Sequence, residues 1–239
     1  MTAAADLLAV WESGLAAAGS RRTVLLHTLA RDGDPEELLA TPVGRRDGDL
    51  LRLRRALFGE RLTGRLACAR CGEELEFDVD VTQLLSAVTD PPPAVTVTHG
   101  GWRVTARPPT SGDLLAVAGV PAGTARSALL ARCLQASDRD GTPTAQPLPD
   151  GVADRLIAAL AEADPGADLR FTVPCVGCGA ACAAPLDIGT YLWAELDAWA
   201  RATLLDVHLL AVTYGWSEAE ILAISPTRRR YYLELSGHA

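Results

Sequence analysis

The chain contains no lysine: all 22 of its basic residues are arginine. Without a lysine amine it cannot form a Schiff base with a carbonyl substrate, hold a nucleotide through a phosphate-loop lysine, or use lysine as a general base. Alanine and leucine are abundant at the same time, a bias typical of a GC-rich coding sequence. We therefore treat the missing lysine as an exclusion of chemistry and not as a sign of function.

Long apolar runs are missing as well. No segment approaches the ~18 consecutive apolar residues that a transmembrane helix requires. The first twenty residues lack a cationic region, and Asp6 and Glu12 interrupt their apolar pattern, which does not fit a secretory signal peptide. We therefore expect a cytoplasmic protein that has no membrane partner. In that reducing setting its six cysteines favour metal ligands or buried thiols over disulfides.

Aromatic residues make up only 5% of the 239 residues, and the formal net charge is −8. Most of this charge lies in residues 136–239, with 7 arginines against 14 acidic residues. Such a balance disfavours a nucleic-acid partner for the chain as a whole. Residues 45–70 are an exception, with eight arginines against three acidic residues. They leave open a zinc-ribbon module associated with nucleic acid as the alternative function, although few aromatic side chains are present for base stacking.

The hydrophobic pattern predicts an α+β fold that is mostly helical. Apolar residues recur at helical spacing through much of the chain, and the longest predicted helix covers 188–214. Strict alternation predicts two small antiparallel hairpins, over 61–80 and 168–186, each with a CxxCG sequence at its tip. A further hairpin is expected over 95–106.

A polar stretch rich in glycine and proline, residues 136–150, predicts a linker. It would separate an N-terminal helical half (1–135), which contains the first CxxC hairpin, from a C-terminal half (151–239). The C-terminal half contains the second CxxC hairpin and the long amphipathic helix.

The two CxxCG sequences predict a structural zinc site. Two thiolates three residues apart on a tight turn can both reach one tetrahedral ion at about 2.3 Å, and the glycine that follows tolerates the positive φ of such a turn. Cys68 and Cys71 form one such zinc knuckle, and Cys175 and Cys178 form the other. Together they would make one shared zinc site that joins the two halves. Four thiolates leave no open position for water, so the site would be structural and not catalytic.

Two other interpretations of the CxxC sequences stay open, a redox pair and free thiols. Redox pairs usually lie where a strand leads into a helix, because the helix N-terminus lowers the thiol pKa, whereas both sequences here lie between strands. Cys182 could be a spare ligand, although an inward-facing residue of the returning strand is the favoured interpretation. Cys133 lies one helical step from Leu129 and Leu130, which favours a core position.

No sequence signature of catalysis is present. GxSxG, HExxH and a glycine-rich phosphate loop are all missing, and no serine, histidine and acid share a nucleophile-type pattern. We therefore expect a protein that is not an enzyme and has no small-molecule substrate. A run of arginines and tyrosines, residues 228–232, could dock a partner or could pack on Trp216 within the chain.

The stretch 191–235 resembles the baseplate-protein family of contractile-tailed phages and its relatives encoded with phage-tail-like contractile injection systems. The pattern is a tryptophan-bearing helix, a "VH-LA" segment, then "YGWSE-EIL" and "RR-YLEL". Its residues here are Trp193, His208, Tyr214, Gly215, Trp216, Ser217, Glu218, Ile221, Leu222, Ser225, Arg228, Arg229, Tyr232, Leu233 and Leu235. The two knuckles, Pro109 with Asp113-Leu114-Leu115, and the Arg132-Cys133 pair are also similar, whereas Cys182 departs from the common pattern.

This resemblance implies a non-enzymatic protein that helps to assemble the baseplate hub, as a chaperone-like adaptor. The expected partners are baseplate or hub proteins. Trp193, Trp216, Arg228, Arg229 and Tyr232 are the residues that we expect to dock such a partner.

Overall fold

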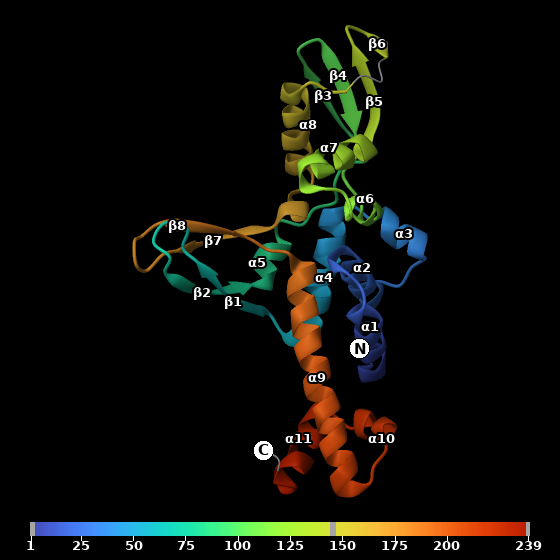
Figure 1. Ribbon diagram of the computed structural model, residues 1–239, viewed down its shortest axis with the longest axis vertical. Coiled ribbons are helices and arrows are strands. Elements are labelled where there is room, and N and C mark those ends of the chain that lie inside the picture. The colour runs from blue at the N-terminus through green and yellow to red at the C-terminus, as the bar shows by residue number, and fades with distance from the viewer. Residues whose placement is uncertain (1–2, 144–146, 238–239) are drawn as a thin grey trace.

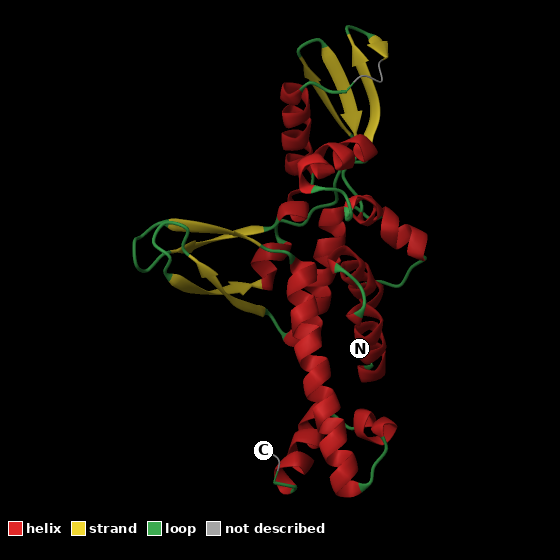
Figure 2. Cartoon of the chain, in the orientation of Figure 1, coloured by secondary structure: helices red, strands yellow, loops and turns green. Residues whose placement is uncertain are grey.

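The computed structural model describes residues 3–143 and 147–237. Within them the chain is mostly helical and contains three antiparallel sheets (Figure 1 and Figure 2), which confirms the predicted α+β class. The elements form a central helical bundle, a lobe at one end, a helical tip at the other end, and a two-hairpin arm that projects from the side (Figure 1). No helix of the described ranges has the length and apolarity needed to cross a membrane.

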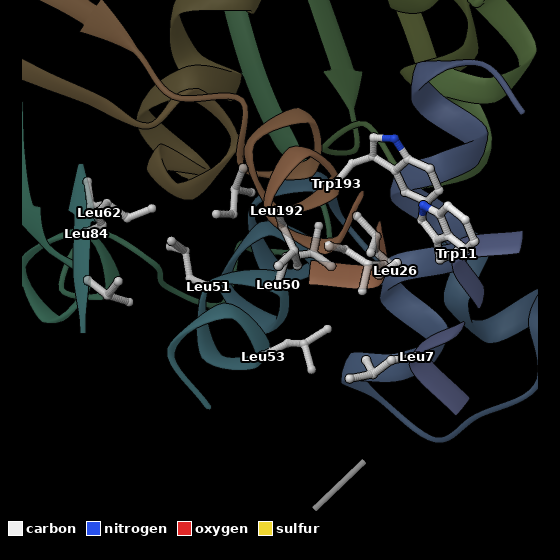
Figure 3. Packing of buried hydrophobic residues seen from close by; sticks show 14 of the residues in the cluster. Leu7, Trp11, Leu26, Leu50, Leu51, Leu53, Leu62, Leu84, Leu192 and Trp193 are labelled. Carbon is white, nitrogen blue, oxygen red and sulfur yellow. The ribbon is translucent and has the colours of Figure 1, made fainter. Parts of the chain in front are cut away.

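The central bundle combines both ends of the sequence. Its elements are α1 (Ala4–Leu15), α2 (Gly19–Ala30), α4 (Val43–Phe58), α5 (Val81–Leu85) and the first half of α9 (Ile188–Tyr214), with α3 (Pro35–Ala40) and α6 (Ser111–Val117) beside α2. Figure 3 shows its leucines and tryptophans meeting between these helices. Leu50, Leu51 and Leu192 are fully buried there. Residues from both predicted halves therefore share one core.

The long helix α9 matches its predicted bounds, 188–214. The Asp187 side chain accepts a hydrogen bond from the Thr190 backbone N–H at its start. Gly215, with φ of 72°, ends it in the left-handed conformation that glycine tolerates best. The first half of α9 packs in the bundle, and its second half supports the tip with α10 (Glu218–Ala223) and α11 (Pro226–Leu235).

The end lobe has a four-stranded sheet of β3 (Val95–His99), β4 (Trp102–Ala106), β5 (Leu134–Arg139) and β6 (Thr142–Pro143). Helix α8 (Asp150–Ala163) packs on this sheet, and α7 (Ala122–Cys133) leads into β5. Strands β5 and β6 therefore occupy part of the predicted linker, 136–150. Residues 144–146 of that prediction lie outside the described residues.

One buried carboxylate organises the junction between the bundle and the end lobe. Asp113 forms a capping box with Thr110 at the start of α6. It also accepts bonds from two arginines, Arg107 on both oxygens and Arg132 at 3.0 Å. Burial opposes its charge, but these bonds lower the pKa of Asp113 to about 2. Since Asp113 lies on α6 and Arg132 lies on α7, their bond joins α6 to the end lobe.

Candidate metal centre

The arm consists of two hairpins that come from distant parts of the chain. One is β1 (Arg61–Ala67) with β2 (Glu74–Asp80), and the other is β7 (Arg170–Pro174) with β8 (Ala181–Pro185). Their tips meet at the far end of the arm (Figure 1). The rings of Phe77 and Phe171 also touch across the hairpins, with centroids 4.6 Å apart. The predicted convergence of the two CxxC turns is therefore confirmed.

The two turns have the same backbone geometry. In the first, the Cys68 N–H donates to Glu73 O and the Gly72 N–H donates to Cys68 O, both at 2.8 Å. In the second, the Cys175 N–H donates to Ala180 O and the Gly179 N–H donates to Cys175 O, again at 2.8 Å. Gly72 and Gly179 have φ of 77° and 70°, a region that disfavours residues with a Cβ. The glycine that follows each CxxC sequence is therefore the residue that allows its turn to close.

The four sulfurs form one compact group. Cys68 Sγ lies 3.7 Å from Cys178 Sγ, and Cys71 Sγ lies 3.5 Å from Cys175 Sγ. All four ligand atoms lie within 4.8 Å of one another. A tetrahedral ion with metal–sulfur bonds of about 2.3 Å needs sulfurs about 3.8 Å apart, whereas a disulfide needs about 2.05 Å. The cluster therefore fits four-coordinate binding of one metal ion, with each hairpin supplying two ligands.

The pKa values of the clustered thiols also favour binding of a cation. Backbone N–H groups of Cys71 and Arg70 donate to the Cys68 sulfur and lower the pKa of that thiol to about 6. At Cys71 the N–H of Glu73 acts in the same direction, but the Cys175 and Cys178 thiols outweigh it and raise the pKa to about 12. Four thiolates can therefore share this space only when a bound cation offsets their charge.

The remaining two cysteines lie outside this group of four. Cys182, on β8, donates its thiol to Ala180 O at 3.8 Å and packs against the sulfur cluster without completing it. Its pKa is raised chiefly by a hydrogen bond to Cys68. Cys133 is buried in the core of the end lobe, as predicted.

The arm is attached to the bundle through Tyr191 of α9. Its hydroxyl donates to Thr63 O at 2.8 Å and accepts from the Thr63 N–H at 3.1 Å. Nearby, Arg54 of α4 makes a bidentate bond to Glu195 of α9, at 2.9 and 2.7 Å. The sequence pattern gives no sign of either contact because the partners are more than a hundred residues apart.

The predicted docking residues divide into two groups. Trp193 is buried in the central bundle, where it packs over Gly14 and under the guanidinium of Arg22 at 4.6 Å. Arg229 is only 3% exposed and lies inside the tip. The predicted docking role therefore does not fit Trp193 or Arg229, since neither side chain lies on the surface.

The other three predicted docking residues lie at the tip, at or near its surface. Trp216 stacks on Tyr214 with centroids 4.7 Å apart and meets the edge of Tyr232 at 4.9 Å. Trp216 and Tyr232 are half-buried, and Arg228 is exposed. Two further residues of α11 are exposed: Tyr231, which lies within the predicted run 228–232, and Leu235, which was missed as a docking candidate. Their spacing of four, which places both on one helix face, was the available signal.

The arginine-rich stretch 45–70 is largely neutralised. Six of its eight arginines form ion pairs with acidic residues: Arg45, Arg46, Arg52, Arg54, Arg61 and Arg65. Within the described ranges, Arg55 and Arg70 are the two that form no ion pair. This pattern offers little unpaired positive charge to a phosphate backbone.

Comparison of the chain with models of protein families, with curated proteins and with solved structures gives no match.

Proposed function

We propose that this protein is a zinc-stabilised, non-enzymatic assembly factor of a phage-tail-like contractile injection system. It acts in the cytoplasm as a chaperone-like adaptor for baseplate or hub proteins. The resemblance of residues 191–235 to baseplate proteins supports this role. The arrangement of the arm supports a structural metal site, since the cysteines of both CxxC turns belong to one cluster of four that leaves no ligand position open.

Zinc is the metal that best suits this site. Thiolates are soft ligands, and four of them in tetrahedral geometry are typical of structural zinc. The core of the arm is small and is built around the cysteines themselves, with Leu75 as its other buried residue. The metal would therefore supply much of the stability of the arm and would hold 61–80 against 170–185.

One observation carries the adaptor role, an exposed face on α11. Arg228, Tyr231 and Leu235 follow one another at spacings of three and four, so they share that face. Tyr231 is 64% exposed and Leu235 is 78% exposed. Exposed aromatic, aliphatic and arginine side chains together are typical of a protein-binding surface. The face lies within the segment that carries the resemblance, on α11, which Figure 1 shows at the tip of the molecule.

The test is assembly of the particle in the host that encodes it. Deleting the gene should abolish assembled baseplates, and the wild-type gene should restore them. A Tyr231→Ser, Leu235→Ser variant should fold normally yet fail to restore assembly or to co-purify with the hub proteins. The matched control is Val176→Ser, because Val176 is also highly exposed, at 86%, but lies on the second knuckle. Normal assembly after deletion would refute the proposed function.

A further inference from the structure

Exposed apolar side chains are concentrated on the second half of α9 and on α11. Seven large hydrophobic residues are exposed among the described residues, and five of them lie between positions 205 and 235. Tyr231 and Leu235 belong to the α11 face discussed above. Leu205 and Val212 belong to α9, where they are 56% and 74% exposed.

The two exposed α9 residues are part of a regular stripe. Apolar residues follow one another at spacings of four, three, four and three: Ala198, Ala202, Leu205, Leu209 and Val212. All are exposed except Leu209, which is half-buried. This spacing is the a/d pattern of a coiled coil and extends over about 21 Å of helix. We call these five residues the α9 seam.

Within the described part of the chain, Leu209 packs against the core of the tip, and the other four residues of the α9 seam belong to no hydrophobic core cluster. The residues of α9 that pack inside the molecule, Ala200, Thr203, Val207 and Leu210, lie on its other side. Because α10 and α11 pack mainly against that buried side, they leave the seam uncovered except at Leu209. A preformed helix with an uncovered a/d stripe has already met the entropic cost of ordering, which favours its association with another helix.

The charges beside the seam identify the partner. Arg201 directly precedes Ala202, an a position of the seam, and Asp206 directly follows Leu205, a d position. Arg201 and Asp206 therefore occupy the g and e positions of successive heptads. In a parallel, in-register pair of α9 helices, Arg201 of each copy lies beside Asp206 of the other copy. Arg201 bonds Asp197 through Nε, and its guanidinium has further donors for a second carboxylate. Asp206 is half-buried and makes no hydrogen bond or ion pair with a described residue, although the charge of Arg229 acts on it.

From the uncovered seam and these complementary flanks we infer that a second copy of this chain binds along α9 and forms a parallel, two-fold symmetric dimer. Reversing one helix would bring the Asp206 flanks of the two copies together, so the charges favour the parallel arrangement. The interface is small, and we expect dissociation in the micromolar range. The inference is independent of the adaptor role, since the α11 face is separate from the seam.

Sedimentation velocity of the full, metal-loaded chain tests the inference. The wild type should pass from monomer to dimer as its concentration rises through the micromolar range. Leu205→Glu should weaken the dimer at least tenfold, whereas Leu235→Glu, an equally drastic change on the exposed α11 face, should leave it unchanged. Circular dichroism checks that both variants are folded. A wild type that stays monomeric at every concentration would overturn the inference and leave the seam to a helix of another protein.

Charge reversal tests the orientation. Arg201→Glu alone and Asp206→Arg alone should each weaken self-association, because each places like charges together. A mixture of the two variants should form a heterodimer more tightly than either variant forms a homodimer, since both inter-copy pairs are then attractive. Equal association in the mixture and in the separate variants would overturn parallel pairing.

Discussion

Asp164 at the end of α8 accepts a hydrogen bond from the backbone N–H of Gly44, 120 positions away in the sequence, at 3.1 Å. Gly44 lies in the first turn of α4, whose N-cap position is Pro42 and has no capping side chain. Asp164 therefore replaces the missing cap from another part of the chain. A Cβ on residue 44 would lie 1.8 Å from Asp164 Oδ1, so the glycine is what allows this approach.

This relationship predicts that Asp164→Ala lowers the free energy of unfolding by about 1 to 2 kcal/mol, because α4 loses its cap. Chemical denaturation measures the loss. Asp154→Ala on the same helix is the matched control, since its ion pair with Arg126 is exposed and should contribute about 0.5 kcal/mol or less. Equal effects of the two substitutions would contradict the capping role.

The packing of Trp193 predicts the effect of Gly14→Ala. The new Cβ would lie 2.3 Å from Trp193 Cη2, so the ring or α1 must move. We expect a loss of about 2 kcal/mol in the free energy of unfolding, despite the higher helix propensity of alanine. Gly123→Ala in α7 is the control, because nothing lies within 4 Å of its Cβ position. It should be neutral or slightly stabilising, and a similar result for Gly14→Ala would show that Trp193 packs loosely.

Metal analysis tests the centre. Purified protein should contain one zinc ion per chain, and Cys68→Ser should lose it, whereas Cys182→Ala should retain it. Cobalt substitution should give the spectrum of tetrahedral four-sulfur ligation in the wild type and in Cys182→Ala. A changed spectrum in Cys182→Ala would make that cysteine a ligand. Protein without metal whose thermal stability is unaffected by chelator would contradict a metal centre altogether.

The buried Asp47 predicts a pH-dependent stability. Burial raises its pKa from 3.8 to about 6, although Arg46 opposes the shift. Between these values the folded state holds a proton that the unfolded state has released. The free energy of unfolding should therefore fall as the pH rises through this range, by an amount on the order of 2 kcal/mol.

Asp47→Asn should remove this fall, because the amide does not titrate. Denaturation of the variant and the wild type from about pH 4.5 to about pH 7.5 measures the difference at each pH. Contributions of the thiols are common to both proteins and cancel in that difference. A constant difference across the range would contradict the raised pKa.

Much of the fold could be predicted from the sequence because its signals are local. Alternating residues define β1 and β2, and Asp187 and Gly215 flank the helical pattern of α9. The convergence of the four cysteines was also predictable, since two knuckles supply the ligands of one ion. Each of these features depends on residue types at short spacing.

Other features depend on contacts between distant residues and could not be predicted. Strand β5 has a polar sequence without alternation, and it is a strand because its backbone pairs with β4. The sequence around Trp193 is compatible with an exposed docking residue. Its ring is buried because Gly14, which is distant in the sequence, has no side chain and leaves room for it. Arg229 lies in a run of arginines, and only the packing of α11 on α9 buries it.

Helix α9 is one uninterrupted segment of 27 residues, and no glycine or proline follows Gly189 within it. It is therefore a stiff rod of about 40 Å. Glu195 and Tyr191 fix its N-terminal part to α4 and to the arm that holds the cysteine cluster, while α10 and α11 are attached to its C-terminal part. A protein bound at α11 would hold a lever whose other end is attached to strand β1 of the arm. Any displacement at the tip would act on the arm as a tilt of the whole helix, and not as a local bend.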